Sequence, residues 1–297
     1  MPFAIAIMGP TTSGKTDVAE SLAERLDAAI VNADAFQIYK GLDIGTAKPK
    51  NKKRYELLDI LEPWEPFSVG KFLEMARPLC ERYANEGKHC IVTGGTGLYI
   101  RALFEEYEEI QKPANPELRE ILRKAWEEVG PKKLAEREGI SLEGLSESFI
   151  RNPAHFLRYI ERKKMPKVSM QRTEWKAEKR KFGLLVPREI LRKRISERVH
   201  RMLEAGWLEE VKALSELGAD ASWPAMRAHG YRELLRVIHK KMSLEEAVNS
   251  IINQISQYAK RQMTWLRKEP NLIWIDAEGT VEEICNRIEN NLQPSAS

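Results

Sequence analysis

The residues from Gly9 to Thr16 have types and a spacing that could do chemistry. They match the P-loop pattern Gly-x-x-x-x-Gly-Lys-Thr of nucleotide-binding proteins. The glycines let backbone N–H groups converge on phosphate oxygens at a helix start, Lys15 adds a point charge, and the Thr16 hydroxyl can bind Mg²⁺. The diphosphate-binding residues that we expect are Gly9, Pro10, Thr11, Thr12, Ser13, Gly14, Lys15 and Thr16.

One carboxylate, Asp34, follows directly on a second short apolar segment, Ala29 to Val31. If that segment is a strand of a parallel sheet, Asp34 lies at the carboxyl edge, where such sheets bind ligands. It would then face whatever group attacks a bound diphosphate ester. A turn aspartate that only caps nearby backbone is the alternative that this residue alone leaves open.

The elements that must position these groups alternate between apolar runs and amphipathic helices. Phe3 to Met8 and His89 to Thr93 are apolar enough for buried strands, while Val18 to Leu26 has the spacing of a helix with one buried stripe. Strands that alternate with helices predict a parallel sheet covered on both faces. We therefore expect an α/β fold of the P-loop NTPase type, with a parallel sheet flanked by helices.

The sequence changes character near Pro113, where strand-like runs give way to charged helical periodicity. We expect an inserted all-helical basic lobe there, with helices from Asn115 to Gly130 and from Ser148 to Lys164, and then a basic loop or hairpin from Met165 to Lys181. The predicted boundaries are residues 1–112 and 182–297 for the catalytic core and residues 113–181 for the insertion.

After the insertion the core elements return. Phe182 to Val186 reads as a strand, and Arg188 to Leu217 as one long amphipathic helix closed by Gly218. A capping box at Ser243 and Glu246 opens a helix that runs to about Arg267, and Leu272 to Ile275 is a last strand.

Charge is unevenly distributed along the 297 residues. The formal net charge is only +4, but residues 151–201 carry 17 Lys or Arg against 5 Asp or Glu, a local +12. We call residues 151–201 the basic segment. Such an asymmetry indicates nucleic-acid binding, and a solvated basic face is the alternative.

Several classes of protein are excluded by what the sequence lacks. No apolar run approaches the roughly 20 residues of a membrane span, and the start of the chain does not read as a secretion signal. The three cysteines are far apart and in no metal or redox spacing, so neither disulfides nor zinc are implied. Nothing resembles a dimerisation zipper. We expect a cytoplasmic protein that acts as a monomer.

The segment after the strand at Cys90 to Thr93 argues against a motor or switch ATPase. Such proteins need a strand ending in Asp for magnesium and a side chain that positions water. Here the strand is followed by Gly94, Gly95 and Thr96, and the only other candidate, Asp59, is a weak match. The P-loop therefore serves a reaction other than hydrolysis that drives motion.

Several separate motifs, taken in order, resemble the tRNA dimethylallyltransferases of the IPP transferase family, and the resemblance spans nearly the whole chain. The motifs are Gly9 to Thr16; Asp34 with Gln37 and Tyr39; Gly41 to Pro49; Leu58 to Ile60 with Pro63, Ser68 and Phe72; Gly94 to Tyr99; Gly230 to Glu233; and Tyr258 to Trp265.

The resemblance implies transfer of a dimethylallyl group from dimethylallyl diphosphate to the N6 amine of the adenosine 3′ of the anticodon in tRNA. Asp34 matches the family's base, which takes a proton from the poorly nucleophilic amine. Arg227 matches an arginine that we interpret as a phosphate clamp, with a surface arginine as the alternative. Asp34, Thr16 and Arg227, together with Mg²⁺, are the expected catalytic groups.

The resemblance also implies contacts with the anticodon stem-loop, whose target base must leave its stack to enter a pocket. Thr96, Arg119 and Arg158 match tRNA-contacting positions, and the basic segment would bind phosphates. Trp175 could stack on a base or pack internally. The tRNA-binding residues that we expect are Asp34, Ala35, Phe36, Gln37, Thr96, Arg119, His155 and Arg158.

The chain departs from the family pattern mostly at positions that concern RNA. Ala35 replaces the usual Ser, and Tyr55 with Glu56 replaces paired histidines. Asn152 and His155 stand where the family has Asp and Arg, and Ser256 where it has Arg. These departures leave the groups for prenyl transfer intact.

Three other functions stay open at this stage. An adenylate isopentenyltransferase shares the P-loop and the Asp base but has no use for a basic helical insertion. A small-molecule P-loop kinase would turn over ATP. A non-catalytic RNA-binding module would not depend on Asp34 for any activity.

Overall fold

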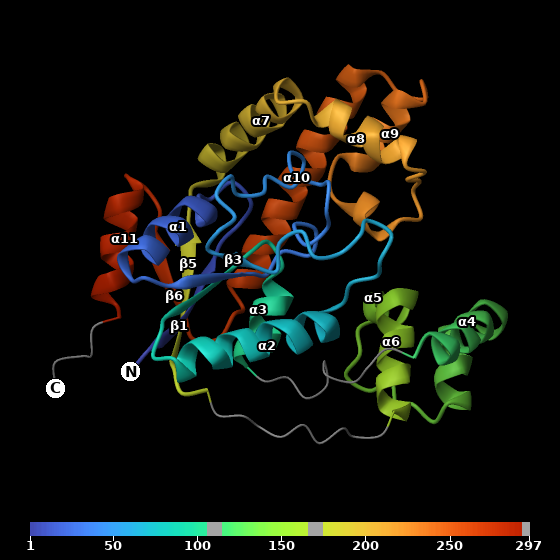
Figure 1. Ribbon diagram of the computed structural model, residues 1–297. Coiled ribbons are helices and arrows are strands. Elements are labelled where there is room, and N and C mark those ends of the chain that lie inside the picture. Colours follow the sequence, from blue (N-terminus) through green and yellow to red (C-terminus); the bar gives the residue numbers. More distant parts are fainter. Residues whose placement is uncertain (106–114, 166–174, 293–297) are drawn as a thin grey trace. The chain divides into compact units, whose positions relative to one another are not determined.

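The computed structural model describes residues 1–105, 115–165 and 175–292 (Figure 1). The chain divides into two compact units, residues 1–106 with 174–297 and residues 107–173. We call the first the core unit and the second the helical lobe. In the described parts of the chain, no helix is both long and apolar enough to cross a membrane.

A single parallel sheet forms the centre of the core unit. Its strands among the described residues are β1 (Phe3–Met8), β2 (Ala29–Asn32), β3 (Tyr55–Glu56), β4 (Cys90–Thr93), β5 (Glu178–Leu185) and β6 (Leu272–Asp276). Their order is β3-β2-β4-β1-β5-β6, and every neighbouring pair is parallel. Ile5 of β1 lies opposite Ile91 of β4, and both are fully buried because helices cover both faces of the sheet.

Helices flank this sheet on both sides, which confirms the predicted α/β fold. On one face, α1 packs over β1, β2 and β4 and against α11, which contacts β6; on the other face, α2 packs on the same three strands and against α3 (Figure 1). The described helices of the core unit are α1 (Lys15–Arg25), α2 (Val69–Asn85), α3 (Gly97–Phe104), α7 (Arg188–Glu204), α8 (Trp207–Glu216), the 3-10 helix η2 (Pro224–Arg227), α9 (Tyr231–Ile238), α10 (Leu244–Leu266) and α11 (Val281–Asn290). The capping box at Ser243 and the helix that it opens are confirmed.

One predicted helix, from Arg188 to Leu217, is wrong, because the chain breaks it into α7 and α8. The break lies at Gly206, whose φ of 97° belongs to the left-handed region and cannot continue a right-handed helix. The apolar periodicity carries on across the break, so periodicity alone did not reveal it. The consequence is a sharp turn that aims Trp207 into a second apolar core.

Trp207 is fully buried between two glycines that are distant in sequence. A Cβ atom added to Gly45 would lie 2.0 Å from Trp207 Nε1, and one added to Gly230 would lie 2.2 Å from Trp207 Cη2. Tyr231 meets the indole edge-on and donates a hydrogen bond to Glu210 Oε1 at 2.6 Å. This packing fixes the loop around Gly45 against α8 and α9.

The strand β5 begins at Glu178, four residues before the predicted start. The first half of the strand is charged, and a charged run does not predict a buried strand. Lys181 is nevertheless buried in the sheet. Lys181 Nζ pairs there with the buried Glu269 at 2.8 Å and also with Glu105. Trp175 just upstream is buried edge-on against Phe104, with the Lys179 ammonium over its ring, so it packs internally.

The helical lobe has a small core of its own. Its described helices are α4 (Pro116–Arg137), α5 (Glu147–Ile150) and α6 (Pro153–Lys164), packed around Leu122, Leu134, Phe156 and Ile160. The Asn115 side chain caps α4 as predicted, and Gly130 kinks it at φ 77°. The single helix predicted from Ser148 to Lys164 is wrong, because Asn152 caps a new helix that starts at Pro153. Residues 113–114 and 166–174, on which parts of the predicted insertion fall, lie outside the described residues.

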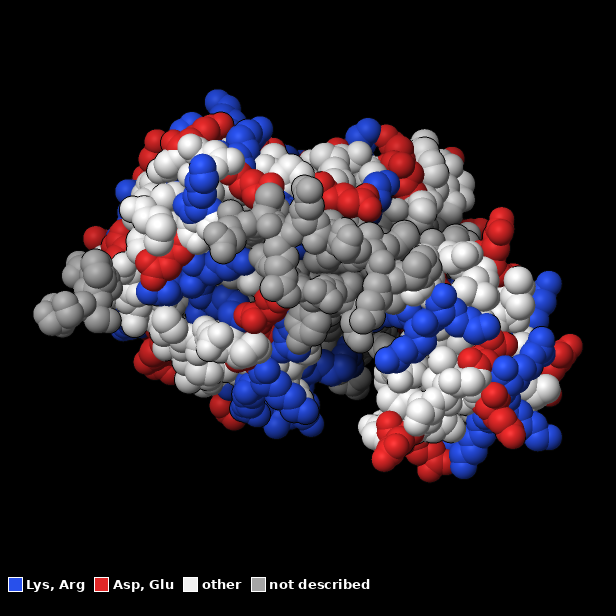
Figure 2. Space-filling model, turned by 90° about the horizontal axis from the view of Figure 1, so that it is seen from below, with Lys and Arg blue, Asp and Glu red and all other residues white. Residues whose placement is uncertain are grey.

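On the face of the molecule shown in Figure 2, basic residues are interspersed with acidic ones. Several cations of the basic segment are held by carboxylates, among them Arg151 by Glu147 at 2.7 Å and Lys164 by Glu138. Local ion pairs therefore offset part of the +12 charge of this segment.

The glycine–tryptophan packing predicts the effect of one added methyl group. In Gly45→Ala, the Cβ must displace a fully buried indole, so we expect a loss of about 1–3 kcal/mol of unfolding free energy. Urea denaturation followed by circular dichroism measures this. Gly70→Ala is the matched control, because its Cβ would meet only Ser68 Oγ at 3.7 Å. Equal stability of the two variants would contradict the packing argument.

Candidate active site

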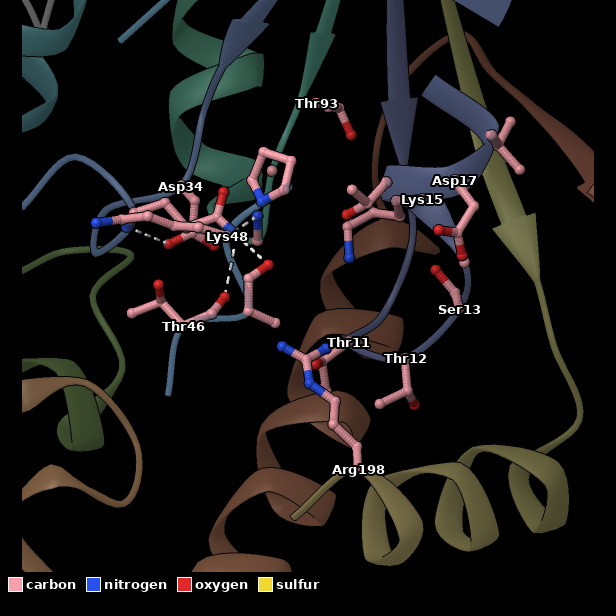
Figure 3. Close-up of a pocket in the computed structure, with 18 of the residues that line it drawn as sticks. Thr11, Thr12, Ser13, Lys15, Asp17, Asp34, Thr46, Lys48, Thr93 and Arg198 are labelled. Atoms are coloured by element: carbon pink, nitrogen blue, oxygen red, sulfur yellow. Dashed lines mark hydrogen bonds between the residues drawn. The ribbon is translucent and has the colours of Figure 1, made fainter. Parts of the chain in front are cut away.

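The loops that follow the parallel strands enclose a cavity of about 940 Å³ (Figure 3). Lys15 at the start of α1, Asp34 after β2 and Arg198 of α7 project into it from different walls. The three groups come from distant parts of the sequence. They meet because the carboxyl ends of neighbouring parallel strands open at the same edge of the sheet.

The P-loop turns between β1 and α1 and lines the cavity with Thr11 to Thr16. Gly14, at φ 87°, precedes the first residue of α1, and no side chain caps the helix there, so the first N–H groups of α1 are available to an anion. The buried hydroxyls of Thr12 and Ser13 have no hydrogen-bond partner within the part of the chain that the structure describes. The loop therefore offers several unused donors in one small volume.

The first two residues of the predicted phosphate loop have a supporting position. Gly9 and Pro10 are buried and do not line the cavity. Pro10 O accepts hydrogen bonds from Ser13 N at 3.2 Å and from Lys15 Nζ at 3.1 Å, which shapes the turn. A Cβ at Gly9 would meet Ser13 Oγ at 2.6 Å, so Gly9 allows the loop to fold back closely on itself.

Lys15 is buried near a second cation, Arg198, and this environment favours the binding of an anion. Burial lowers the pKa of Lys15 to about 8, with a further contribution from the Arg198 charge and an opposing one from Asp34. Burial likewise lowers the pKa of Arg198, against the attraction of Asp34. Among the described residues, Arg198 forms no ion pair. A bound anion would offset the repulsion between these two cations.

Asp34 caps the turn that follows β2 and also lines the cavity. Its Oδ1 accepts hydrogen bonds from Phe36 N at 2.9 Å and Gln37 N at 3.3 Å, and its Oδ2 accepts one from Gly95 N at 3.1 Å. A carboxylate has about four acceptor sites, so these three bonds orient it and leave room for one proton from the cavity side. Asp34 is thus a turn residue that also faces the cavity.

The other residues expected around the target base are divided between the cavity and its surroundings. Gln37 lines the cavity and donates from Nε2 to Thr46 O at 3.0 Å and Ala47 O at 3.2 Å. Phe36 packs on the apolar core beneath, and Ala35 N donates to Thr96 Oγ1 at 3.1 Å. Thr96 lines an adjoining, mainly apolar pocket of about 250 Å³, which shares with the main cavity the lining residues Gly94, Gly95, Tyr258 and Gln262.

Arg227 lies outside this cavity. It is exposed at the end of η2, where its charge opposes the burial that raises the pKa of Tyr39 to about 12. The arginines that do line the cavity are Arg194, Arg198 and Arg201 of α7. Their spacing of four and three residues places them on one face of a helix and was visible in the sequence, where it was interpreted only as part of the basic segment.

The two lobe arginines expected to contact tRNA share one buried carboxylate, Glu161. Arg119 donates to Glu161 Oε2 at 2.8 and 3.1 Å, and Arg158 lies 2.7 Å from Glu161 Oε1. Burial would raise the pKa of Glu161, but the Asn115 N–H and the two guanidiniums together lower it. His155 is exposed in the first turn of α6. The lobe thus presents these side chains from a fixed helix pair.

Two models of known protein families match this chain. The family model described as IPP transferase matches residues 37–269, and that described as isopentenyl transferase matches residues 3–58. The chain belongs to the IPP transferase family.

Relatives within the family match this chain over nearly its full length. A tRNA dimethylallyltransferase of Acetivibrio thermocellus is 37% identical over 94% of this chain and 93% of its own. One of Anoxybacillus flavithermus is 36% identical over 96% of each. The crystal structure of a tRNA isopentenylpyrophosphate transferase from Bacillus halodurans has a TM-score of 0.72 at 30% identity, covering 98% of this chain and 97% of that one.

The lowered pKa of Lys15 predicts how anion binding depends on pH. Its ammonium form dominates at pH 7 and is mostly lost at pH 9, so affinity for inorganic diphosphate with Mg²⁺ should fall about tenfold between these values. Isothermal titration calorimetry measures this. Lys15→Arg stays charged and should show no such fall. A fall of equal size in that variant would assign the pH dependence to another group.

The two ion pairs of Glu161 lead to a prediction about the stability of the helical lobe. Glu161→Gln removes the buried charge that both arginines share, so local opening of α6 should become easier by about 2 kcal/mol. Native-state hydrogen exchange of α6 amides measures this. Glu147→Gln breaks an exposed pair with Arg151 and should change exchange by less than about 0.5 kcal/mol. Unchanged protection in Glu161→Gln would rule out this role.

Proposed function

We propose that this protein transfers a dimethylallyl group from dimethylallyl diphosphate to the N6 amine of the adenosine 3′ of the anticodon in tRNA, releasing diphosphate. The observation that carries the proposal is the meeting of Asp34 and the P-loop in one cavity. A site with a proton acceptor opposite a diphosphate cradle suits displacement of diphosphate by a weak nucleophile. The names of the family relatives support the same reaction.

In this reaction one bond forms as another breaks. The amine nitrogen bonds to C1 of the dimethylallyl group, the bond from C1 to the diphosphate oxygen breaks, and its electron pair leaves with the diphosphate. The amine proton passes to Asp34, whose other hydrogen bonds hold it in place. Charge that gathers on the leaving group is stabilised by Lys15 and the P-loop N–H groups, with Arg198 rather than Arg227 in the cavity beside them.

The P-loop also fits a magnesium ion that arrives with the diphosphate. Mg²⁺ usually takes one or two protein oxygens together with phosphate oxygens and waters. The Thr16 hydroxyl and the Asp17 carboxylate line the cavity, whereas the described residues contain no cluster of three or more His, Cys, Asp or Glu that could hold a metal. Thr16 is therefore the protein ligand that we assign, and the ion would neutralise part of the diphosphate charge.

The helical lobe favours tRNA over a free nucleotide as the acceptor. A free adenylate needs only the cavity, whereas an anticodon stem-loop needs phosphate contacts beyond it. We assign Arg119, His155 and Arg158 to such contacts, and Ala35, Phe36, Gln37 and Thr96 to the surroundings of the flipped adenine. All these residues belong to one chain, so we propose that the protein acts as a monomer. We also propose that the reaction takes place in the cytoplasm, where tRNA is found.

Labelled donor tests the reaction and its acceptor together. The protein is incubated with Mg²⁺ and radiolabelled dimethylallyl diphosphate, with unmodified tRNA in one arm and adenylate in the other. We expect label in tRNA, and a loss of about 10²- to 10⁴-fold in turnover for Asp34→Asn because the general base is gone. Asp220→Asn, a surface aspartate bonded to Ser222, is the control.

The other outcomes separate the alternatives. Label in adenylate alone would move the protein to the adenylate isopentenyltransferases. In a third arm that holds ATP in place of dimethylallyl diphosphate, consumption of ATP by a protein that places no label in either acceptor would point to a kinase. Full activity of Asp34→Asn would refute the assignment of the base.

A further inference from the structure

Gln262 of α10 joins two walls of the cavity through one side chain. Thr11 N donates to Gln262 Oε1 at 2.8 Å, and Gln262 Nε2 donates to Gly95 O at 2.9 Å. Gly95 N donates in turn to Asp34 Oδ2 at 3.1 Å. A continuous path of hydrogen bonds therefore runs from the P-loop to the carboxylate.

We propose that Gln262 is a positioning residue for prenyl transfer, which holds the P-loop and Asp34 at the separation that the reaction needs. The inference rests on the proposed function, because it assigns the diphosphate to the P-loop and the proton to Asp34. In-line displacement requires the reacting atoms to lie about 3–3.5 Å apart, so the two loops that carry the donor and the base must be fixed relative to each other.

The chemistry of the two contacts explains why this residue is a glutamine. Thr11 presents an N–H group and Gly95 presents a carbonyl, so the bridge needs an acceptor and a donor on one side chain. A primary amide supplies both, whereas a carboxylate only accepts and an ammonium only donates. The neighbouring turn of α10 adds Tyr258, whose hydroxyl also donates to Gly95 O, at 2.8 Å. Gly95 O thus has two side-chain donors, and Thr11 N has Gln262.

Close packing makes the bridge stiff. A Cβ at Gly95 would lie 2.6 Å from Asp34 Oδ2, and a Cβ at Gly94 would lie 2.2 Å from the carbonyl carbon of Ala33. The loop after β4 is therefore in direct contact with the loop that carries the base. A displacement of Gly95 must move the Asp34 carboxylate, because nothing flexible lies between them.

Gln262 bonds to both Thr11 and Gly95, whereas Tyr258 bonds only to Gly95, so variants of the two residues can be compared. Donor KM and the single-turnover rate at saturating donor and tRNA are measured for Gln262→Met, Tyr258→Phe and the wild type. Gln262→Met breaks both links, so we expect donor KM to rise about tenfold and the rate to fall about a hundredfold. Tyr258→Phe loosens only the Gly95 side and should lower the rate with donor KM within about twofold of wild type.

Two controls separate a positioning role of Gln262 from a role that only holds α10 in place. Gln254→Met removes a glutamine of the same helix that bonds to Glu233 and Ser250, and it should leave both constants unchanged. In a double-mutant cycle, Gln262→Met should add little to the loss caused by Asp34→Asn, because both changes act on the same proton transfer. A purely structural role would give additive losses and an unchanged donor KM.

The outcomes distinguish this inference from the proposed function. A wild-type protein that places no label in tRNA would refute the function and the inference with it. An active wild type whose Gln262→Met variant keeps wild-type KM and rate would overturn the inference alone, as would additive losses in the cycle. If Gln262→Met does not fold, Tyr258→Phe decides: the inference fails if its rate equals that of wild type.

Discussion

The backbone of Gly94 lies so close to that of Ala33 that no side chain fits between them, and the site depends on this approach. β2 and β4 are parallel neighbours, so the loops that follow them leave the sheet side by side. Their contact brings Gly95 N to the Asp34 carboxylate and Thr96 Oγ1 to Ala35 N. Since β1 pairs with the other edge of β4, the P-loop emerges next to the same point. Asp34 and the P-loop thus face one cavity because of the order of these three strands.

Two buried carboxylates each pair with two cations. Glu161 orients Arg119 and Arg158 in the helical lobe, and Glu269 does the same for Arg101 and Lys181 beside the sheet. A buried charge is tolerated only when it is paired, so each carboxylate fixes two long side chains that would otherwise move freely. Arg198 contrasts with these, because its position in the cavity leaves its charge for a ligand.

The sequence was sufficient for features that depend on local patterns. The P-loop, the strand before Asp34, the capping box at Ser243 and the cap at Asn115 follow from short motifs whose physics is local. What it missed has two causes. The left-handed backbone of Gly206 ends α7 although the apolar periodicity continues across it. The charged start of β5 joins the sheet through tertiary contacts, namely its pairing with β1 and the ion pair of Lys181 with Glu269.

Some residues of the candidate site could likewise be predicted from local patterns, and others could not. Asp34 was placed at the cavity from its position after β2, but the hydrogen bonds that orient it come from Gly95 as well as from its own turn. Arg198 and Gln262 lie more than 180 residues from the P-loop, and only the packing of α7 and α10 brings them there. Arg227 shows the converse, since a position near a motif does not fix the direction of a side chain.

The contact of Trp207 with Gly45 and Gly230 has a consequence for how this chain can vary. The indole occupies the space that a methyl group at either glycine would need, so neither glycine can be replaced while the tryptophan stays where it is. A smaller residue at position 207 would remove the clash with the indole at both glycines and leave a void that some neighbour must fill, but Gly230, at φ 91°, would still be restricted by its left-handed backbone. The packing therefore couples three positions that are spread over 186 residues. We expect them to change together in related sequences or to stay the same.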